Sequence, residues 1–358
     1  MSSLVMIIKN IFSFAISIIS LFIVVLFSNI SSKADQNNIK YYSKDEGILS
    51  IMYHRFNESE YPSTNIQMDI FKEHIQIIKK SNFNFQNPNK FKEQFSTIRL
   101  KKEILITIDD GFESFYFEAW PYLKKNKIPF ILFVSTEPVG KNGYMTWDQI
   151  REIEKESFAL IGHHSHSHEY LIDETNDKFI LDIEKANKIF LRELGYVPDL
   201  FSYPFGEYSK LMVDYISKNF EFAFGQHSGV IDVNKDKFEL PRFPINEKYG
   251  ELKRFSSIVN YFPLEYKKLL PLEKQLTEST NPPKFVVEFF EEQKNLNNIN
   301  CYSNEANKWE KSNTILSGTV LSIEFRAPFE PRRGRVNCSL NDNGKWRWFG
   351  VQFPIKTN

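Results

Sequence analysis

This sequence has no net charge. Its 45 basic side chains balance its 45 acidic ones over 358 residues. A balanced charge gives no long-range field to gather nucleic acid or an acidic membrane surface, so we expect a ligand that is neutral or recognised locally. Internal repeats and low-complexity tracts are also missing. With 42% hydrophobic residues, the chain can form one large globular domain and a small one.

Cysteine is nearly absent, because the chain contains only Cys301 and Cys338. Such a pair usually forms a disulfide in an oxidising compartment, whereas cytosolic cysteines are more often unrelated thiols. The N-terminus favours the disulfide. Residues 11–27 form an apolar run after Lys9, and Ser32-Lys33-Ala34 offers a small-residue cleavage site.

We therefore predict that residues 1–34 are a signal peptide or, because the run nearly spans a bilayer, an uncleaved N-terminal anchor. Either alternative implies export to the periplasm or cell envelope. Contact with a membrane is expected only through this anchor, and the sequence does not identify protein partners.

Apolar runs alternate with helical patterns between residues 47 and 270. Strands are predicted at Gly47–Tyr53, Ile104–Ile108, Phe130–Val134, Phe158–Gly162, Leu200–Tyr203 and Phe222–Phe224. Helices are predicted at Met68–Lys80, Phe115–Lys125, Lys178–Glu193 and Lys210–Asn219. This alternation predicts parallel strands with helices outside, as an α/β barrel or an open sheet.

The pattern changes after about Leu270, where prolines punctuate a polar linker. Short β-type runs follow at Lys284–Phe290, Thr319–Arg326 and Trp346–Phe353, which predicts a small β-sandwich over residues 284–358. In the last run Trp346 and Trp348 would share one strand face, either as core or as platforms for sugar rings. The basic cluster Arg332, Arg333 and Arg335 is either part of such a surface or a solvated loop.

A pair of carboxylates ends one predicted strand, in Thr107-Ile108-Asp109-Asp110-Gly111. Carboxyl ends of strands are where α/β folds build active sites. Adjacent carboxylates repel each other, so both stay ionised only near a cation or hydrogen-bond donors. The alternative is an ordinary Asp-Asp-Gly turn.

Four of the seven histidines lie in the run His163-His164-Ser165-His166-Ser167-His168. Two neutral imidazoles and one carboxylate would give an open metal site with room for water and substrate. A histidine-rich tract that binds metal adventitiously is the alternative. A third segment, Phe201–Gly206, ends in a Pro-aromatic-Gly turn and says little by itself.

In this order the three segments resemble the motifs of the polysaccharide deacetylase family with the NodB-type domain, also called carbohydrate esterase family 4. The resemblance covers residues 47–247 and implies a distorted (β/α) barrel, here followed by a small C-terminal β-sandwich-like domain. It implies that Asp109 is the general base, and that Asp110, His164 and His168 hold one divalent metal ion. Zinc is the default for this ligand set, and cobalt, nickel or iron fit the same geometry.

The third motif departs from the family pattern, because Ser202 stands where the family has an arginine that orients the catalytic aspartate. Arg242 either supplies the missing guanidinium or is a surface residue. Pro204 and Phe205 keep the turn of the motif, and the resemblance implies that the N–H of Phe205 binds the oxyanion.

The family's last motif, a leucine-rich strand ending in histidine, is missing downstream but occurs upstream as Ile48–His54. This resembles the circularly permuted branch that includes periplasmic deacetylases of poly-N-acetylglucosamine. It implies that His54 is the general acid. The alternative is that His54 is only a histidine at a strand end, hydrogen-bonded to the backbone. His227 is the reserve candidate for the general acid. His163 and His166 would be bystanders.

We therefore expect metal-dependent removal of N-acetyl groups from a polysaccharide in the cell envelope, with an N-acetylglucosamine polymer as one candidate. Two alternatives stay open. The missing third-motif arginine suggests a carbohydrate-binding or scaffolding protein with weakened catalysis, although the intact Asp109 argues against it. The other alternative is an O-acetyl esterase.

Overall fold

The structure, a computed structural model, describes residues 45–96 and 102–356. The predicted leader at residues 1–34 lies outside this part of the chain. None of the helices described is both long and apolar enough to cross a bilayer. The described residues all belong to one compact unit. The proposed domain limits, 47–270 and 284–358, remain a prediction.

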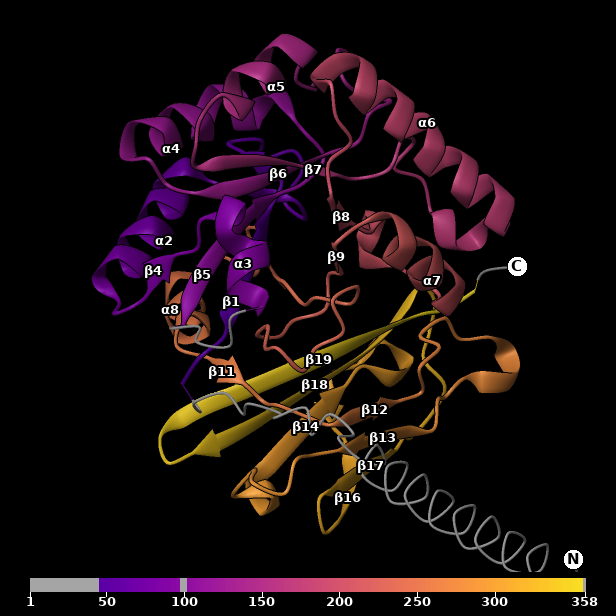
Figure 1. Cartoon of the computed structure of the whole chain (residues 1–358). Coiled ribbons are helices and arrows are strands. Elements are labelled where there is room, and N and C mark those ends of the chain that lie inside the picture. Colours follow the sequence, from indigo (N-terminus) through magenta and orange to yellow (C-terminus); the bar gives the residue numbers. More distant parts are fainter. Residues whose placement is uncertain (1–44, 97–101, 357–358) are drawn as a thin grey trace, which may run out of the picture. The chain divides into compact units, whose positions relative to one another are not determined.

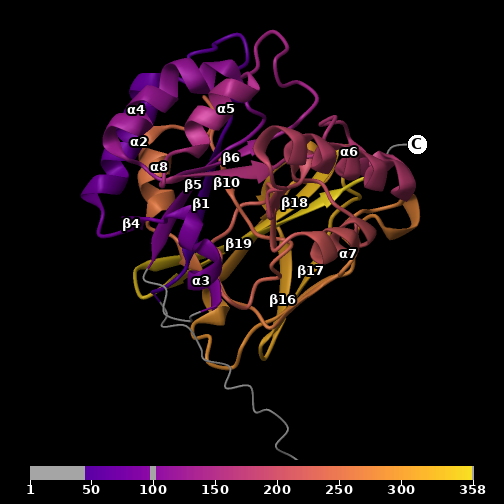
Figure 2. The ribbon, with the colours of Figure 1, turned by 45° about the horizontal axis from the view of Figure 1, so that its top comes forward.

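A parallel sheet of eight strands forms the first half of this unit, in the order β10-β1-β5-β6-β7-β8-β9 with β4 beside β5. Helices α2, α4, α5, α6 and α7 lie outside the strands (Figures 1 and 2). The predicted (β/α) architecture is therefore confirmed. The strands are β1 (Ile48–Tyr53), β4 (Asn84–Phe85), β5 (Glu103–Ile108), β6 (Phe130–Val134), β7 (Ala159–His163), β8 (Leu200–Ser202), β9 (Phe222–Phe224) and β10 (Phe243–Pro244). A separate pair is formed by β2 (Arg55–Phe56) and β3 (Asn65–Ile66).

The helices follow the predicted patterns closely. Of the four predicted helices, only the one after Asp110 differs in kind, because it starts with a π-helical turn, η2 (Phe115–Ala119), before α4 begins. Helices α3 (Phe91–Ser96), α5 (Trp147–Glu154) and α8 (Leu252–Val259) were not predicted from the sequence. The α-helices are α2 (Met68–Lys80), α3 (Phe91–Ser96), α4 (Trp120–Asn126), α5 (Trp147–Glu154), α6 (Asn176–Leu194), α7 (Lys210–Asn219) and α8 (Leu252–Val259). Short 3-10 turns are η1 (Pro88–Lys90), η3 (Leu171–Asp173), η4 (Pro204–Gly206), η5 (Glu278–Thr280), η6 (Leu296–Asn298) and η7 (Glu305–Asn307).

Successive side chains of the strands point to opposite faces of the sheet. Leu49 and Ile104 pack with helix residues such as Phe71 in one buried apolar cluster. Their neighbours Ile48 and Leu105 belong to a second cluster, built from strands all around the sheet and from α3. This second cluster fills the inside of the barrel near the N-terminal ends of the strands.

The ring of strands is completed by the stretch Leu240–Pro244. Leu240 pairs with Phe224 at the end of β9, and β10 pairs with β1 through Phe243 and Pro244. One short segment therefore joins the two edges of the sheet. Arg242 lies between these contacts, on the same strand face as Leu240, and its side chain is fully buried.

A second layer of structure, the C-terminal module (residues 262–356), consists of two sheets that share one apolar core. Its strand orders are β11-β19-β18-β14-β15 and β12-β13-β17-β16. The strands are β11 (Phe262–Pro263), β12 (Lys268–Leu270), β13 (Phe285–Glu288), β14 (Ile299–Ser303), β15 (Glu310–Lys311), β16 (Asn313–Ser317), β17 (Val320–Glu324), β18 (Arg333–Asp342) and β19 (Lys345–Pro354). The sandwich therefore takes strands from before residue 284. Cys301 and Cys338 face each other on β14 and β18 and form the predicted disulfide.

Strand β19 runs along the barrel. Its Trp348 donates to Ser228 Oγ at 3.1 Å and stacks on Tyr261. A Cβ at Gly350 would come within 2.4 Å of the Ser228 carbonyl oxygen, so only glycine permits this approach. Trp348 thus packs on the barrel, and Trp346 is 45% exposed. The alternative in which both tryptophans form sandwich core is wrong, because their strand face is turned to the barrel and to solvent.

Candidate functional site

The predicted motif residues gather at the C-terminal ends of the barrel strands. Asp109 and Asp110 directly follow β5, and His164 directly follows β7. Strand alternation places Asp109 on the same face as Leu105, which precedes it by four residues and points into the barrel. The inside of the barrel is therefore apolar at the N-terminal ends of the strands and polar at the C-terminal ends, where α/β folds carry their sites.

The four histidines of the run point in different directions. His164 and His168 turn toward Asp110. His163 is buried on the opposite face among the rings of Phe190, Phe201 and Phe220, where burial lowers its pKa to about 3. His166 likewise points away, and its Nδ1 lies 2.8 Å from Thr136 Oγ1. The structure thus separates the two residues predicted as ligands from the two predicted as bystanders.

Asp110, His164 and His168 form a group whose candidate ligand atoms all lie within 4.8 Å of one another. Asp110 Oδ1 is 3.2 Å from His164 Nε2 and 3.0 Å from His168 Nε2. Asp110 and His168 both have left-handed backbone conformations, with φ of 75° and 56°. Such conformations cost energy for residues other than glycine, and they are commonest at functional sites.

The hydrogen bonds around His164 fit a metal ligand. Its Nδ1 lies 2.7 Å from the carbonyl oxygen of Ser202, which can only accept, so Nδ1 carries the proton. The lone pair of Nε2 then faces Asp110 Oδ1, and both buried atoms lack a hydrogen-bond partner. A cation between two such acceptors would compensate both of them in a buried site. The residues present therefore fit a divalent metal ion.

The side chains of this group also shift one another's pKa. Although burial raises the pKa of Asp110, the neighbouring His168 and His164 hold it well below its usual value. Burial lowers the pKa of His168, but the Asp110 carboxylate outweighs this effect and raises it. Asp110 is thus ionised at neutral pH, as a metal ligand must be.

Asp109 forms a buried ion pair with Arg242. The guanidinium donates from Nη1 to Asp109 Oδ1 at 2.7 Å and from Nη2 to Oδ2 at 2.8 Å. Nη2 also donates to Ser202 Oγ at 2.7 Å, and Nε donates to the Gly225 carbonyl at 2.9 Å. Although burial raises the pKa of Asp109, Arg242 holds it below its usual value. The alternative of a surface arginine is wrong, because Arg242 is fully buried.

The two histidines considered as general acid have different surroundings. His54 feels the charges of Asp110 and Asp109, which raise its pKa, but burial dominates and lowers it. His227 instead lies near Lys274 and Lys235, and burial together with these cations lowers its pKa to about 3. His54 therefore interacts with the charges of the two aspartates, whereas His227 interacts with lysines outside the site.

The Pro204–Gly206 turn borders the same site. Phe205 has a left-handed φ of 56°, and its ring centroid lies 4.7 Å from that of His168. Tyr170 stacks on Phe205 at 3.9 Å. The sequence did not single out Tyr170, and its position two residues after His168 was the only available signal.

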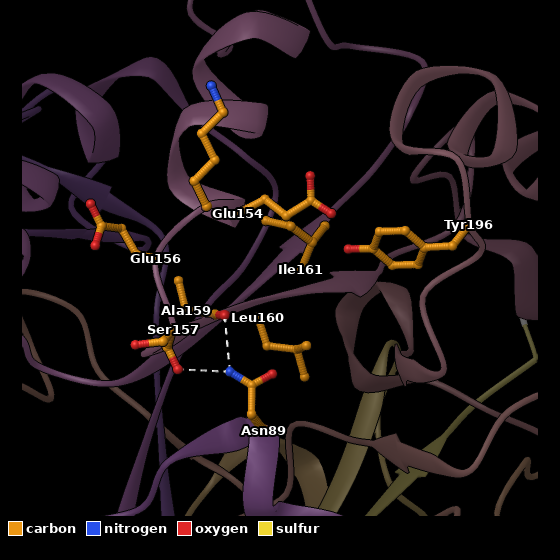
Figure 3. A pocket seen from close by; sticks show the side chains of 9 residues that line it. Asn89, Glu154, Glu156, Ser157, Ala159, Leu160, Ile161 and Tyr196 are labelled. Carbon is orange, nitrogen blue, oxygen red and sulfur yellow. Dashed lines mark hydrogen bonds between the residues drawn. The ribbon is translucent and has the colours of Figure 1, made fainter.

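A cavity of about 300 Å³ lies elsewhere, at the N-terminal end of β7 (Figure 3). Asn89 reaches into it and donates to the carbonyl oxygens of Ser157 and Ala159. This is the end of β7 opposite to His163 and His164, so the cavity is separate from the site described above. It is lined by Asn89, Glu154, Lys155, Glu156, Ser157, Ala159, Leu160, Ile161 and Tyr196.

Comparison with known proteins agrees with these motifs. Residues 98–222 match the family model described as polysaccharide deacetylase. This segment is therefore similar to polysaccharide deacetylases. Polysaccharide deacetylases are hydrolases of carbon–nitrogen bonds other than peptide bonds, so the predicted enzyme class is confirmed.

Relatives of the deacetylase domain include the poly-beta-1,6-N-acetyl-D-glucosamine N-deacetylase of Staphylococcus aureus, which is 22% identical over 61% of this chain and 86% of its own length. A putative polysaccharide deacetylase of Bacillus subtilis is 23% identical over 45% of this chain and 57% of its own length.

Solved structures show the same fold. A Streptococcus pyogenes deacetylase in complex with acetate aligns with a TM-score of 0.54 and 20% identity, over 60% of this chain and 98% of that protein. The protein IcaB of Ammonifex degensii aligns with a TM-score of 0.52 and 23% identity, over 61% of this chain and 99% of that protein. About two fifths of this chain therefore has no counterpart in either structure.

Proposed function

We propose that this protein removes N-acetyl groups from a polysaccharide of the cell envelope, and that a polymer of N-acetylglucosamine is its substrate. The observation that carries the proposal is the group of Asp110, His164 and His168, in which Asp110 Oδ1 and His164 Nε2 are buried without a hydrogen-bond partner. The buried ion pair of Asp109 and Arg242 lies beside this group. The Staphylococcus aureus relative is named as a poly-beta-1,6-N-acetyl-D-glucosamine N-deacetylase, which supports the choice of glycan. The apolar run near the N-terminus supports export.

Asp110, His164 and His168 would hold one divalent ion, with zinc as the first candidate and cobalt, nickel or iron as the others. When bound, such an ion supplies a Lewis acid for the acetamide carbonyl and lowers the pKa of water. The position of His164 is fixed by its bond to the Ser202 carbonyl, which keeps its free nitrogen directed at Asp110.

The remaining steps belong to the protein. Asp109 accepts the proton of the attacking water, and Arg242 keeps this carboxylate ionised and oriented. The N–H of Phe205 donates to the developing oxyanion. His54 gives a proton to the leaving amine, which then departs as the free amino group of the sugar.

The test is acetate release from purified glycans, namely poly-N-acetylglucosamine, N-acetylated peptidoglycan and an O-acetylated polysaccharide. Release from the N-acetylated polymer, abolished by a chelator and restored by zinc, is the expected result. Release only from the O-acetylated glycan would make the protein an esterase, and release from none would leave a binding protein.

The metal assignment has its own control within the histidine run. His168→Ala is expected to lose both the metal and the activity, whereas His166→Ala is expected to keep both, because His166 points away from Asp110. Elemental analysis measures the metal content of each variant. Full occupancy in His168→Ala would contradict the assignment.

A further inference from the structure

Arg332 of the C-terminal module reaches two loops of the barrel at once. Its Nη1 donates to Asp173 Oδ2 at 2.7 Å. Its Nη2 and Nε donate to the carboxylate of Glu207 at 2.8 and 3.1 Å. Asp173 lies in the connection between β7 and α6, and Glu207 lies in the connection between β8 and α7. One side chain from outside the barrel therefore ties these two loops together.

Both loops carry residues of the proposed site. The first contains His168, and the second contains Phe205. The Arg332 guanidinium lies 3.7 Å from the centroid of the Tyr170 ring, which stacks on Phe205, and Phe205 in turn contacts the His168 ring. A continuous series of ring contacts thus leads from Arg332 to a proposed metal ligand.

Two more residues of the C-terminal module, Gln352 and Arg333, bind the segment Phe205–Glu207. Gln352 on β19 donates from Nε2 to the carbonyl oxygens of Phe205 and Gly206, each at 3.3 Å. Arg333 donates to Glu207, which is only 2% exposed. A left-handed residue such as Phe205 persists only where its surroundings hold it. Removing Arg332 would weaken this support and leave part of a buried carboxylate without its partner.

We propose that Arg332 is a positioning residue of the deacetylase site, by which the C-terminal module holds the His168 loop and the Phe205 loop in their working arrangement. The proposal rests on the proposed function. The module lies beyond the matched family segment, which ends at residue 222, and two aligned structures lack a counterpart for about two fifths of this chain. Arg332 and Gln352 therefore lie outside the segment that matches the family model.

The test compares full-length Arg332→Ala with full-length Arg326→Ala. Arg326 also bridges two carboxylates, Glu305 and Glu310, but it does so inside the C-terminal module. In Arg332→Ala we expect kcat for acetate release to fall by at least about tenfold while KM changes by less than about twofold, because a displaced group costs rate more than binding. Arg326→Ala is expected to keep the wild-type kcat.

A second measurement does not depend on turnover. Zinc affinity, measured by competition with a chromogenic chelator, is expected to fall by on the order of tenfold in Arg332→Ala and to stay unchanged in Arg326→Ala. Methylguanidinium added at millimolar concentration is expected to restore part of the activity of Arg332→Ala alone. A wild-type protein that binds zinc but releases no acetate would refute the proposed function, while the affinity difference would still test the role of Arg332.

The proposal is overturned if Arg332→Ala folds and keeps wild-type kcat and zinc affinity. It is also overturned if both alanine variants lose activity to the same extent, because the effect would then be general destabilisation. Where Arg332→Ala fails to fold, Arg332→Lys replaces it. Lysine keeps the charge but lacks the planar fork that reaches both Asp173 and Glu207, so the same losses are expected in smaller measure.

Discussion

Replacing Arg242 by methionine tests the centre of the proposed mechanism. Methionine has a similar length but no donors, so Asp109 would lose two charge-assisted bonds of 2.7 and 2.8 Å. Both side chains of this pair are fully buried. Removing one partner of a buried ion pair typically costs about 3–5 kcal/mol of unfolding free energy, because the remaining charge is left without compensation.

The pH dependence of the variant follows from the same contacts. Arg242 holds the pKa of Asp109 below its usual value, against the effect of burial. In the wild type the ion pair therefore stabilises the fold above the pKa of the unfolded chain, and this contribution disappears as pH falls through the folded pKa. Without Arg242, the raising effect of burial on the pKa of Asp109 would be opposed only by His164 and His54. Because the base must be ionised, the acidic limb of the pH–rate profile is expected to move to higher pH.

The assay is acetate release across a pH series, together with chemical denaturation and metal analysis at neutral pH. Arg242→Met is expected to keep its metal and to lose kcat by on the order of 10²-fold, since the base is no longer oriented. Arg347→Met is the matched control, because Arg347 is also buried and pairs with Asp342 at 3.0 Å inside the C-terminal module. The reasoning is refuted if Arg242→Met retains kcat within about twofold of wild type, or if Arg347→Met loses as much activity.

Three further outcomes are expected. His54→Ala should keep the metal and lower kcat by a factor on the order of 10², whereas His227→Ala should have a mild effect; the reverse result in the same acetate assay would transfer the acid role. Asp109→Asn should keep full metal occupancy by elemental analysis and lose turnover, and near-normal acetate release would contradict its role as base. Reduction of the Cys301–Cys338 bridge, which spans 37 positions, should lower the unfolding free energy by roughly 3–4 kcal/mol in denaturant titrations; equal stability of the reduced protein would argue against this contribution.

The sequence predicted the barrel well because its signals are local. Alternating apolar runs identify strands such as β5 and β6 with nearly the observed ends, and the positions of Asp110 and His164 after their strands follow directly. The π-helical turn at Phe115–Ala119 was not predicted, since helical periodicity does not separate it from an α-helix.

Long-range contacts could not be predicted in this way. The sequence left Arg242 undecided, because its pairing with Asp109 depends on closure of the barrel across 133 positions. The basic cluster could be read equally as a solvated loop, and only the packing of β19 along the barrel brings Arg332 to Asp173 and Glu207. The surroundings of Trp348 stayed undecided for the same reason, because a strand pattern does not say which neighbour covers each face.

The closing stretch Leu240–Pro244 also sets the order in which the site can come into existence. Asp110, His164 and His168 come from neighbouring parts of the sequence and can meet while the chain is still incomplete. Arg242 reaches Asp109 only when the last stretch of the ring is in place, and contacts of such long sequence separation form slowly. A partly folded chain would therefore bind its metal and still be inactive. Hydrolysis would then begin only when the fold is complete.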